Sequence, residues 1–259
     1  MMIGRLPQRR VLVIQHIACE PPAAYEDELV ERGIALERVE IDQQEPLPDW
    51  RDFDAIVAMG GPMRANDDHR LPWLSEEKRV IGEAVRAGLP YWGVCLGAQL
   101  LAASLGAAVY RGDAPEVGMH DVVLTDSAAE DPVFAHAPAA FTTLQWHSDT
   151  FDLPEGSVLL ASSAAYRHQA FTWKRAYGLQ FHLEVPVELA AQWGEVPAYA
   201  TALEQTLGPG AMPRLIEHVA HAEGPMSVLA RMLFGRWLDG VVEPAPSFTA
   251  DGARRASAP

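Results

Sequence analysis

The feature that most constrains this fold is a cysteine between two glycines, at the point where an apolar run meets a helical pattern. Residues 89–94 are apolar and short enough to form a buried strand, and residues 99–105 have helical periodicity. Cys95 lies between them, flanked by Gly93 and Gly97. A turn this tight brings backbones together, and only glycine tolerates that without a Cβ clash. The sequence therefore predicts a strand–turn–helix unit with Cys95 at the turn.

The pattern G-x-C-x-G is the cysteine form of the nucleophile elbow. Such a turn lifts the sulfur clear of the chain and aims it at the N-terminus of the next helix. There the helix dipole and the free N–H groups favour a thiolate over a thiol. The alternative is a buried structural cysteine in a glycine-punctuated turn.

A base for this nucleophile is found in residues 177–185, where apolar and polar residues alternate as in a strand. His182 and Glu184 are two apart, so on a strand they project from the same face. A nucleophilic cysteine needs a base, and the base needs an acceptor that fixes its tautomer. Cys95, His182 and Glu184 fill those three roles. The alternative for His182 is a half-buried strand histidine beside a surface glutamate.

The first half of the chain alternates between strand and helix signals. Before the cysteine, strands are expected at 10–17, 35–41 and 54–59, and helices at 23–32 and 75–87, the latter with Ser75 as N-cap. This order predicts an α/β fold with a mostly parallel, doubly wound central sheet and helices on both faces.

After Gly106 the pattern changes to short β-like runs separated by turns. We expect a small antiparallel insertion and a returning hairpin, built from residues 109–111, 119–125, 141–146, 158–162, 169–173 and 178–182. Helical patterns follow at 187–207 and 212–238. The expected organisation is one domain over 10–185, a C-terminal helical extension over 186–240 packed on the same domain, and a disordered tail over 241–259.

Composition limits the partners and the compartment. The 259 residues carry a formal net charge of −15, which argues against nucleic acid or an anionic membrane as the main partner. The two cysteines, Cys19 and Cys95, form no disulfide framework, and a free thiol suits a reducing cytosol. No apolar run approaches a membrane span, and the first residues lack the core of a signal peptide. We therefore expect a cytoplasmic protein.

Four blocks of sequence, in order, resemble the class I glutamine amidotransferases of the triad type. Two of them are residues 93–99 and residues 181–184, discussed above. Residues 59–67 with 71–74, and residues 145–149 with 153–156, are similar to stand-alone members related to the amidotransferase domain of GMP synthase. The resemblance covers roughly residues 10–185 and implies a flavodoxin-like fold.

The resemblance implies a mechanism without a cofactor. The Cys95 thiolate attacks the carboxamide of glutamine, ammonia leaves, and water releases glutamate from a γ-glutamyl thioester. His182 takes the thiol proton and hands one to ammonia, while Glu184 orients His182. The oxyanion is expected to meet the backbone N–H groups of Leu96 and Gly61.

Further positions carry expectations of substrate binding. The Gly60–Gly61 pair leaves a bare backbone that a substrate can approach, and Gln99 is expected to hold the amino-acid end of glutamine. Glu116 and Gly118 match a segment where relatives bind glutamine through backbone groups. His147 and Asp149 match a family motif near the site, although a polar loop explains them equally well. No metal site is expected, because the histidines that might supply one show no ligand spacing: His16, His69, His120 and His168.

The ammonia acceptor stays open, because the GMP synthase relatives carry or recruit a synthetase domain and no phosphate-binding glycine loop is present here. A separate ammonia-accepting synthetase is therefore a possible partner. The relatives' His-Pro-Glu is His-Leu-Glu here, with Leu183 expected to point away from the site. The alternatives are a hydrolase of γ-glutamyl peptides with the same triad, a non-catalytic binding module, and an intracellular cysteine peptidase with a related core. The oligomeric state is also left open.

Overall fold

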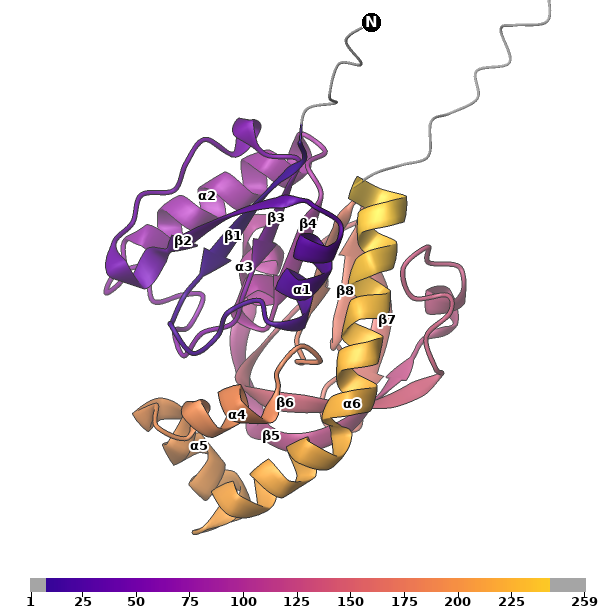
Figure 1. Ribbon diagram of the computed structural model, residues 1–259. Coiled ribbons are helices and arrows are strands. Elements are labelled where there is room, and N and C mark those ends of the chain that lie inside the picture. Colours follow the sequence, from indigo (N-terminus) through magenta and orange to yellow (C-terminus); the bar gives the residue numbers. More distant parts are fainter. Residues whose placement is uncertain (1–7, 243–259) are drawn as a thin grey trace, which may run out of the picture.

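The structure, a computed structural model, describes residues 8–242 and is built around one nine-stranded sheet (Figure 1). The strand order is β2-β1-β3-β4-β9-β8-β7-β5-β6. The first five strands in this order run parallel, and the last four continue the same sheet in antiparallel fashion. The predicted mostly parallel core with an antiparallel addition is confirmed.

The parallel half consists of five short strands. Apart from the edge strand β2, their residues are mostly apolar and buried, as is typical of parallel strands covered on both faces. They are β1 (Arg10–Gln15), β2 (Ala35–Glu40), β3 (Ala55–Ala58), β4 (Tyr91–Val94) and β9 (Ala176–Leu179).

The antiparallel half consists of β5 (Val109–Leu124), β6 (Ala140–Phe151), β7 (Val158–Ser163) and β8 (Ala170–Trp173). Two short runs predicted at 109–111 and 119–125 are one strand, β5. Its register against β6 shifts between Arg111 and Glu116, and this bulge absorbs the intervening residues that interrupt the alternation.

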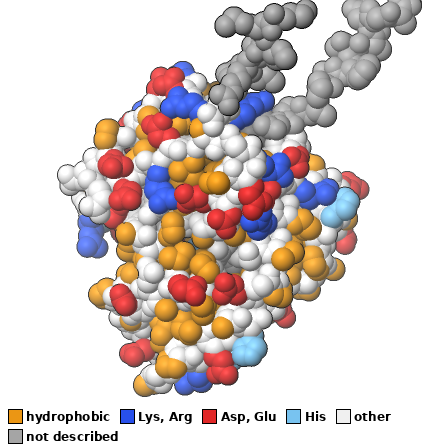
Figure 2. Space-filling view, in the orientation of Figure 1, with side chains coloured by type: hydrophobic (Ala, Val, Ile, Leu, Met, Phe, Trp, Pro, Cys, Tyr) orange, Lys and Arg blue, Asp and Glu red, His pale blue; other side chains and the backbone are white. Residues whose placement is uncertain are grey.

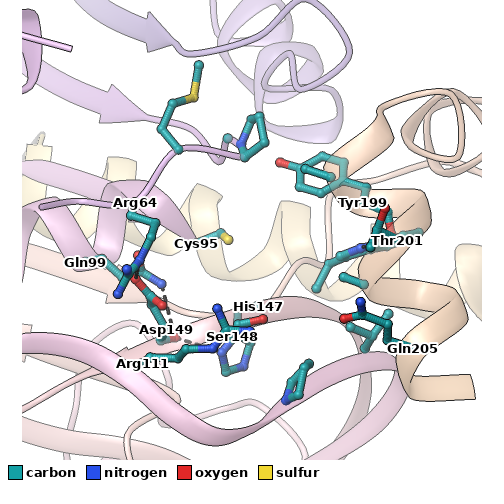
Figure 3. Close-up of a pocket in the computed structure, with 18 of the residues that line it drawn as sticks. Arg64, Cys95, Gln99, Arg111, His147, Ser148, Asp149, Tyr199, Thr201 and Gln205 are labelled. Carbon is teal, nitrogen blue, oxygen red and sulfur yellow. Dashed lines mark hydrogen bonds and ion pairs between the residues drawn. The ribbon is translucent and has the colours of Figure 1, made fainter. Parts of the chain in front are cut away.

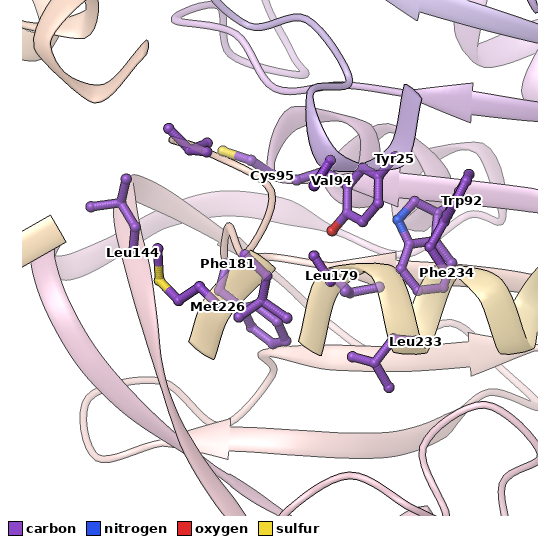
Figure 4. Close-up of a cluster of buried hydrophobic side chains, with 14 of the residues drawn as sticks. Tyr25, Trp92, Val94, Cys95, Leu144, Leu179, Phe181, Met226, Leu233 and Phe234 are labelled. Atoms are coloured by element: carbon purple, nitrogen blue, oxygen red, sulfur yellow. The ribbon is translucent and has the colours of Figure 1, made fainter. Parts of the chain in front are cut away.

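Helices cover both faces of the sheet and enclose two cores. One face carries α1 (Ala24–Glu31) and α6 (Ala211–Trp237), and the other carries α2 (Trp73–Arg86) and α3 (Leu96–Ser104). Trp92 of β4 packs against Phe234 of α6, with ring centroids 5.5 Å apart (Figure 4). The long helix α6 contains Pro225 and bends along its length (Figure 1). The C-terminal extension is therefore part of the main core.

The local predictions need three corrections. The second helix begins at Trp73, not after Ser75, whose hydroxyl instead donates to Asp68 at 2.7 Å. The helix expected over 187–207 is two helices, α4 (Val187–Trp193) and α5 (Pro197–Leu207), because Pro197 begins a new one. The expected tail begins too early: a π-helical turn spans Leu238–Val242, and residues 243–259 lie outside the described residues.

On the face shown in Figure 2, acidic and basic side chains are interspersed and form no broad basic patch. Among residues 8–242, no helix combines the length and apolarity needed to cross a bilayer.

Candidate functional site

Cys95 lies at the carboxyl end of β4, the edge at which open α/β sheets place their sites. Its backbone has φ 51°, a region that L-residues rarely adopt. A Cβ on Gly93 would lie 2.6 Å from the Gly97 backbone, and one on Gly97 would lie 2.2 Å from the carbonyl oxygen of Ala58. The predicted tight turn is confirmed, and both flanking glycines are required by contact.

Two backbone hydrogen bonds fix this turn to its neighbours. The Cys95 N–H donates to the Leu179 carbonyl at 2.7 Å, and the Gly97 N–H donates to the Met59 carbonyl at 3.1 Å. The first bond joins the turn to β9, which leads to His182. The second joins it to the end of β3, which leads to Gly60 and Gly61. Three segments distant in sequence therefore meet at one point.

His182 and Glu184 come together, although not on a strand. The strand β9 ends at Leu179, and His182 forms an isolated antiparallel bridge with Leu144. Glu184 places Oε1 2.7 Å from Nδ1 of His182, and its Oε2 accepts the Leu183 N–H at 3.0 Å. The strand prediction for these residues is thus wrong, but the pairing of the two side chains is present.

The electrostatics of His182 are set by burial and two neighbours. Burial lowers the pKa of His182, but the Glu184 carboxylate and a hydrogen bond with Cys95 outweigh it and raise the pKa well above the ordinary value. Trp193 of α4 packs edge-on against the imidazole, with ring centroids 4.8 Å apart. The imidazole is therefore held between a thiol and a carboxylate, away from water.

The Gly60–Gly61 loop packs tightly against this group. A Cβ on Gly60 would lie 3.1 Å from Cε1 of His182, and one on Gly61 would lie 3.2 Å from a methyl carbon of Leu96. Leu96 is the first residue of α3, so its N–H has no partner within the helix. Gly61 and Cys95 line the same cavity.

This cavity has a volume of about 520 Å³ and two unlike walls. Figure 3 shows Arg64, Gln99, Arg111 and Asp149 on one side of the Cys95 sulfur. The opposite wall comes from α5 and includes Tyr199, Thr201 and Gln205 (Figure 3). The C-terminal helices of this chain thus cover part of the face around Cys95.

The polar wall is a connected network. The Gln99 amide donates to the Asp149 carbonyl at 3.2 Å and to Oε1 of Gln180 at 3.1 Å. Asp149 forms an ion pair with Arg64 at 2.8 Å. His147 places Nδ1 3.0 Å from the Asp149 carbonyl. These bonds engage the amide nitrogen of Gln99 and leave its amide oxygen for other contacts.

Other residues predicted for the site lie around the cavity rather than in it. Gly118 pairs with Gln145 across β5 and β6. It does not line the cavity, whereas its neighbour Val117 does. Glu116 is buried and bonds Nε2 of His147 at 3.0 Å. Burial raises the pKa of Glu116, but the bonds from His147 and Ser163 prevail and lower it.

Two residues beside His182 were not predicted. Glu20 follows β1 and is 3% exposed, and Tyr199 of α5 donates its hydroxyl hydrogen bond to Oε1 of this carboxyl. Oε2 of Glu20 has no hydrogen-bond partner among the described residues. Burial raises the pKa of Glu20, although the charge of His182 opposes the shift. A polar residue just after a parallel strand was the available signal for Glu20; no signal marked Tyr199.

No group of three or more His, Cys, Asp or Glu side chains within the described range is arranged to hold a metal ion. The chemistry available here is that of a thiol, an imidazole, a carboxylate and backbone N–H groups.

Comparison with known proteins shows the family to which this chain belongs. The family model for class I glutamine amidotransferase matches residues 23–191. The chain is 32% identical over 184 residues to the glutamine amidotransferase-like protein YfeJ of Salmonella typhimurium, covering 69% of this chain and 77% of that protein. It is 30% identical over 155 residues to one subunit of the glutamine-hydrolyzing GMP synthase of Sulfurisphaera tokodaii, covering 59% and 78%.

Solved structures agree. A glutamine amidotransferase of Thermotoga maritima superposes with a TM-score of 0.81 at 32% identity, covering 90% of this chain and 100% of that one. A glutamine amidotransferase of Methylobacillus flagellatus gives 0.80 at 28% identity, covering 90% and 96%. With the matched family model and these relatives, this chain belongs to the class I glutamine amidotransferases.

Proposed function

We propose that this protein hydrolyses the carboxamide of glutamine through a γ-glutamyl thioester on Cys95. The observation that carries the proposal is the His182 imidazole, whose Nδ1 lies 2.7 Å from Glu184 and whose pKa is raised by Glu184 and by the neighbouring Cys95. Since Nδ1 is committed to the carboxylate, Nε2 remains for the thiol. This is the arrangement that nucleophile, base and orienting acceptor require.

In the proposed reaction the Cys95 thiolate attacks the amide carbon and forms a tetrahedral oxyanion. The N–H groups of Leu96 and Gly61 receive that charge. The carbon–nitrogen bond then breaks, and His182 gives its proton to the departing ammonia. Water attacks the thioester, His182 takes a proton from it, and glutamate leaves. Gln99 is assigned to the amino-acid end of the substrate.

The test is to incubate the purified protein with L-glutamine and to measure ammonia and glutamate together. We expect both products in equal amounts, and a γ-glutamyl adduct on Cys95 by mass spectrometry after rapid acid quench. Cys95→Ala is the matched control and should produce neither. Turnover by Cys95→Ala within a few-fold of wild type would rule out this mechanism, and folded wild-type protein with no turnover or adduct would favour a binding module.

A second candidate substrate, a γ-glutamyl amide larger than glutamine, is favoured by the cavity. Its volume of about 520 Å³ exceeds the space that a glutamine side chain needs, and part of its wall is apolar surface of α5. The thioester is the same, but an amine replaces ammonia as the leaving group. Comparing kcat/KM for glutamine and for γ-glutamyl dipeptides decides between them.

Because α5 of this chain already covers part of the cavity, the protein could act with or without a partner protein. Relatives include chains named as one of the subunits of GMP synthase, which supports an ammonia-accepting synthetase as a partner here. A partner-dependent enzyme should turn over glutamine weakly until a synthetase-containing extract is added. A self-sufficient hydrolase, with its site covered by its own helices, should be unaffected by extract and should prefer the γ-glutamyl dipeptide.

A further inference from the structure

Another buried histidine–carboxylate pair lies behind the Gly60–Gly61 loop. His16 follows β1, Glu77 lies on α2, and the side chains of both are 0% exposed. Nε2 of His16 is 3.0 Å and 3.1 Å from the two carboxylate oxygens of Glu77. Its other nitrogen, Nδ1, is 3.2 Å from the carbonyl oxygen of Gly60. The imidazole thus connects a helix of the scaffold to the loop beside Cys95.

The two partners of His16 determine its protonation. A carbonyl and a carboxylate only accept hydrogen bonds, so each ring nitrogen must carry a proton for both bonds to form. Burial lowers the pKa of His16, but the charge and hydrogen bond of Glu77 outweigh it and raise the pKa. The bond to Gly60 is therefore a charge-assisted one, which is stronger than a neutral bond.

That bond fixes the orientation of one peptide group. In a trans peptide the carbonyl and the following N–H point in opposite directions, and no described peptide bond is cis. With the Gly60 carbonyl directed at His16, the Gly61 N–H is directed away from it, and Gly61 lines the cavity with Cys95. Within the described part of the chain, the Gly61 N–H donates no hydrogen bond to protein.

The loop needs such a restraint because of its composition. Two consecutive glycines have no side chains to anchor them, and each has wide backbone freedom. A Cβ at Gly61 would lie 2.8 Å from Cβ of His16, so the packing that requires glycine here also brings His16 against the loop. A side chain that holds the carbonyl restores the order that the glycines lack.

We propose that the His16–Glu77 pair is a positioning device that holds the Gly60–Gly61 peptide with its N–H aimed at the oxyanion formed on Cys95. The inference rests on the proposed role of Cys95 as nucleophile. His16 does not touch substrate; it acts through the backbone of Gly60. Glu77 supplies the negative charge that keeps His16 doubly protonated.

Two double variants separate this role from simple stabilisation. An asparagine amide nitrogen occupies the position of Nδ1 of histidine, and a glutamine amide nitrogen occupies that of Nε2. His16→Asn with Glu77→Gln, the asparagine variant, therefore keeps a donor for the Gly60 carbonyl. His16→Gln with Glu77→Gln, the glutamine variant, instead keeps the contact with residue 77. Both lose the same ion pair. Both are made in a Cys19→Ala background, so that Cys95 is the one thiol.

Two reactions of Cys95 are compared in each variant. Acylation by p-nitrophenyl acetate, followed by release of p-nitrophenolate, passes through a tetrahedral oxyanion. Alkylation by iodoacetamide is a direct displacement without one, so it reports the thiolate alone. Neither reagent contains a γ-glutamyl group. Failure of wild type to hydrolyse glutamine would therefore count against the proposed function, while the acylation-to-alkylation ratio tests the positioning role.

We expect the acylation-to-alkylation ratio to fall at least about tenfold in the glutamine variant relative to the asparagine variant, since loss of one oxyanion donor lowers rates by about 10²–10³. The glutamine variant should have the higher melting temperature, because it keeps its contact with residue 77. Equal ratios in the two variants, or acylation and alkylation falling together, would overturn the inference. If a double variant does not fold, His16→Gln alone, with Glu77 retained, is compared with wild type by the same ratio.

Discussion

The carboxylate of Glu184 makes two bonds at once, 2.7 Å to Nδ1 of His182 and 3.0 Å to the backbone N–H of Leu183. The second bond fixes the carboxylate against its own chain, so the first can orient the imidazole. Glu184→Gln can still accept one hydrogen bond but cannot stabilise an imidazolium. We expect kcat for glutamine to fall roughly 10²- to 10⁴-fold.

His182→Ala should approach the loss seen for Cys95→Ala, because members of a triad act as a unit and their effects do not add. Steady-state ammonia release from the three variants measures this ranking. Wild-type activity in Glu184→Gln would show that Glu184 has no part in the reaction.

The two cysteines should differ sharply in reactivity. Burial, and then the charge of Glu20, raise the pKa of Cys19 to about 11. At pH 8 roughly one Cys19 thiol in a thousand is then ionised, and the thiolate is the reactive form. We expect iodoacetamide to label Cys95 and to leave Cys19 unlabelled, as measured by peptide mass spectrometry. Preferential labelling of Cys19 would contradict the assignment of the nucleophile.

Glu20 predicts a pH dependence of stability. Because its pKa is raised by burial, the folded protein retains a proton that the unfolded chain releases near an ordinary pKa of about 4.3. Stability is therefore lost as the pH rises from that value through the raised pKa. Glu20→Gln has no carboxyl group to titrate, so it does not lose stability in this way. The free energy of unfolding of the variant minus that of wild type should therefore increase as the pH rises from 4 to 8. The exposed Glu204→Gln on α5 is the control and should follow wild type.

The glycines of the turn give a stability test. Gly97→Ala places a methyl group 2.2 Å from a backbone oxygen of Ala58, which cannot move without shifting β3. We expect unfolding to become easier by about 3 kcal/mol. Gly224→Ala on α6 meets nothing within 4 Å and should change stability by no more than about 1 kcal/mol. Chemical denaturation of both variants makes the comparison; similar values would mean that the turn is not tightly packed.

The α5 wall predicts substrate preference. Ala202 belongs to α5 and lines the cavity, so Ala202→Phe adds a ring to the α5 wall. If that side holds the leaving group, the kcat/KM of a γ-glutamyl dipeptide should fall at least about tenfold relative to that of glutamine. Competition assays with both substrates measure the ratio directly. An unchanged ratio would mean that the leaving group does not bind against α5.

The sequence predicted those parts of the site that local pattern controls. The glycines around Cys95 signal a tight turn because backbone contact forbids other residues, and that contact is present. The pairing of His182 with Glu184 was predicted from a strand pattern, but the observed strand ends at Leu179, three residues before His182. The pairing survives because one residue between two side chains also allows them to meet in an irregular loop that a bridge to Leu144 holds in place.

Residues that join the site through tertiary packing carried no local signal beyond the position of His16 and Glu20 after β1. His16 becomes informative only when the fold brings Gly60 against it, 44 residues away in sequence. Tyr199 lies beyond residue 191, where the match to the family model ends. Its role depends on where α5 lies on the sheet, which periodicity does not determine. The merged strand β5 was missed for a related reason, since a bulge has no alternation of its own.

The strained backbone at Cys95 has an evolutionary consequence. A side chain at φ 51° costs about 1–3 kcal/mol that glycine would not incur, so the fold alone would favour glycine at this position. Under the proposed function, selection for thiol chemistry opposes that drift. The same proposal predicts that, within this family, a chain with glycine at the turn has gained stability and lost the activity.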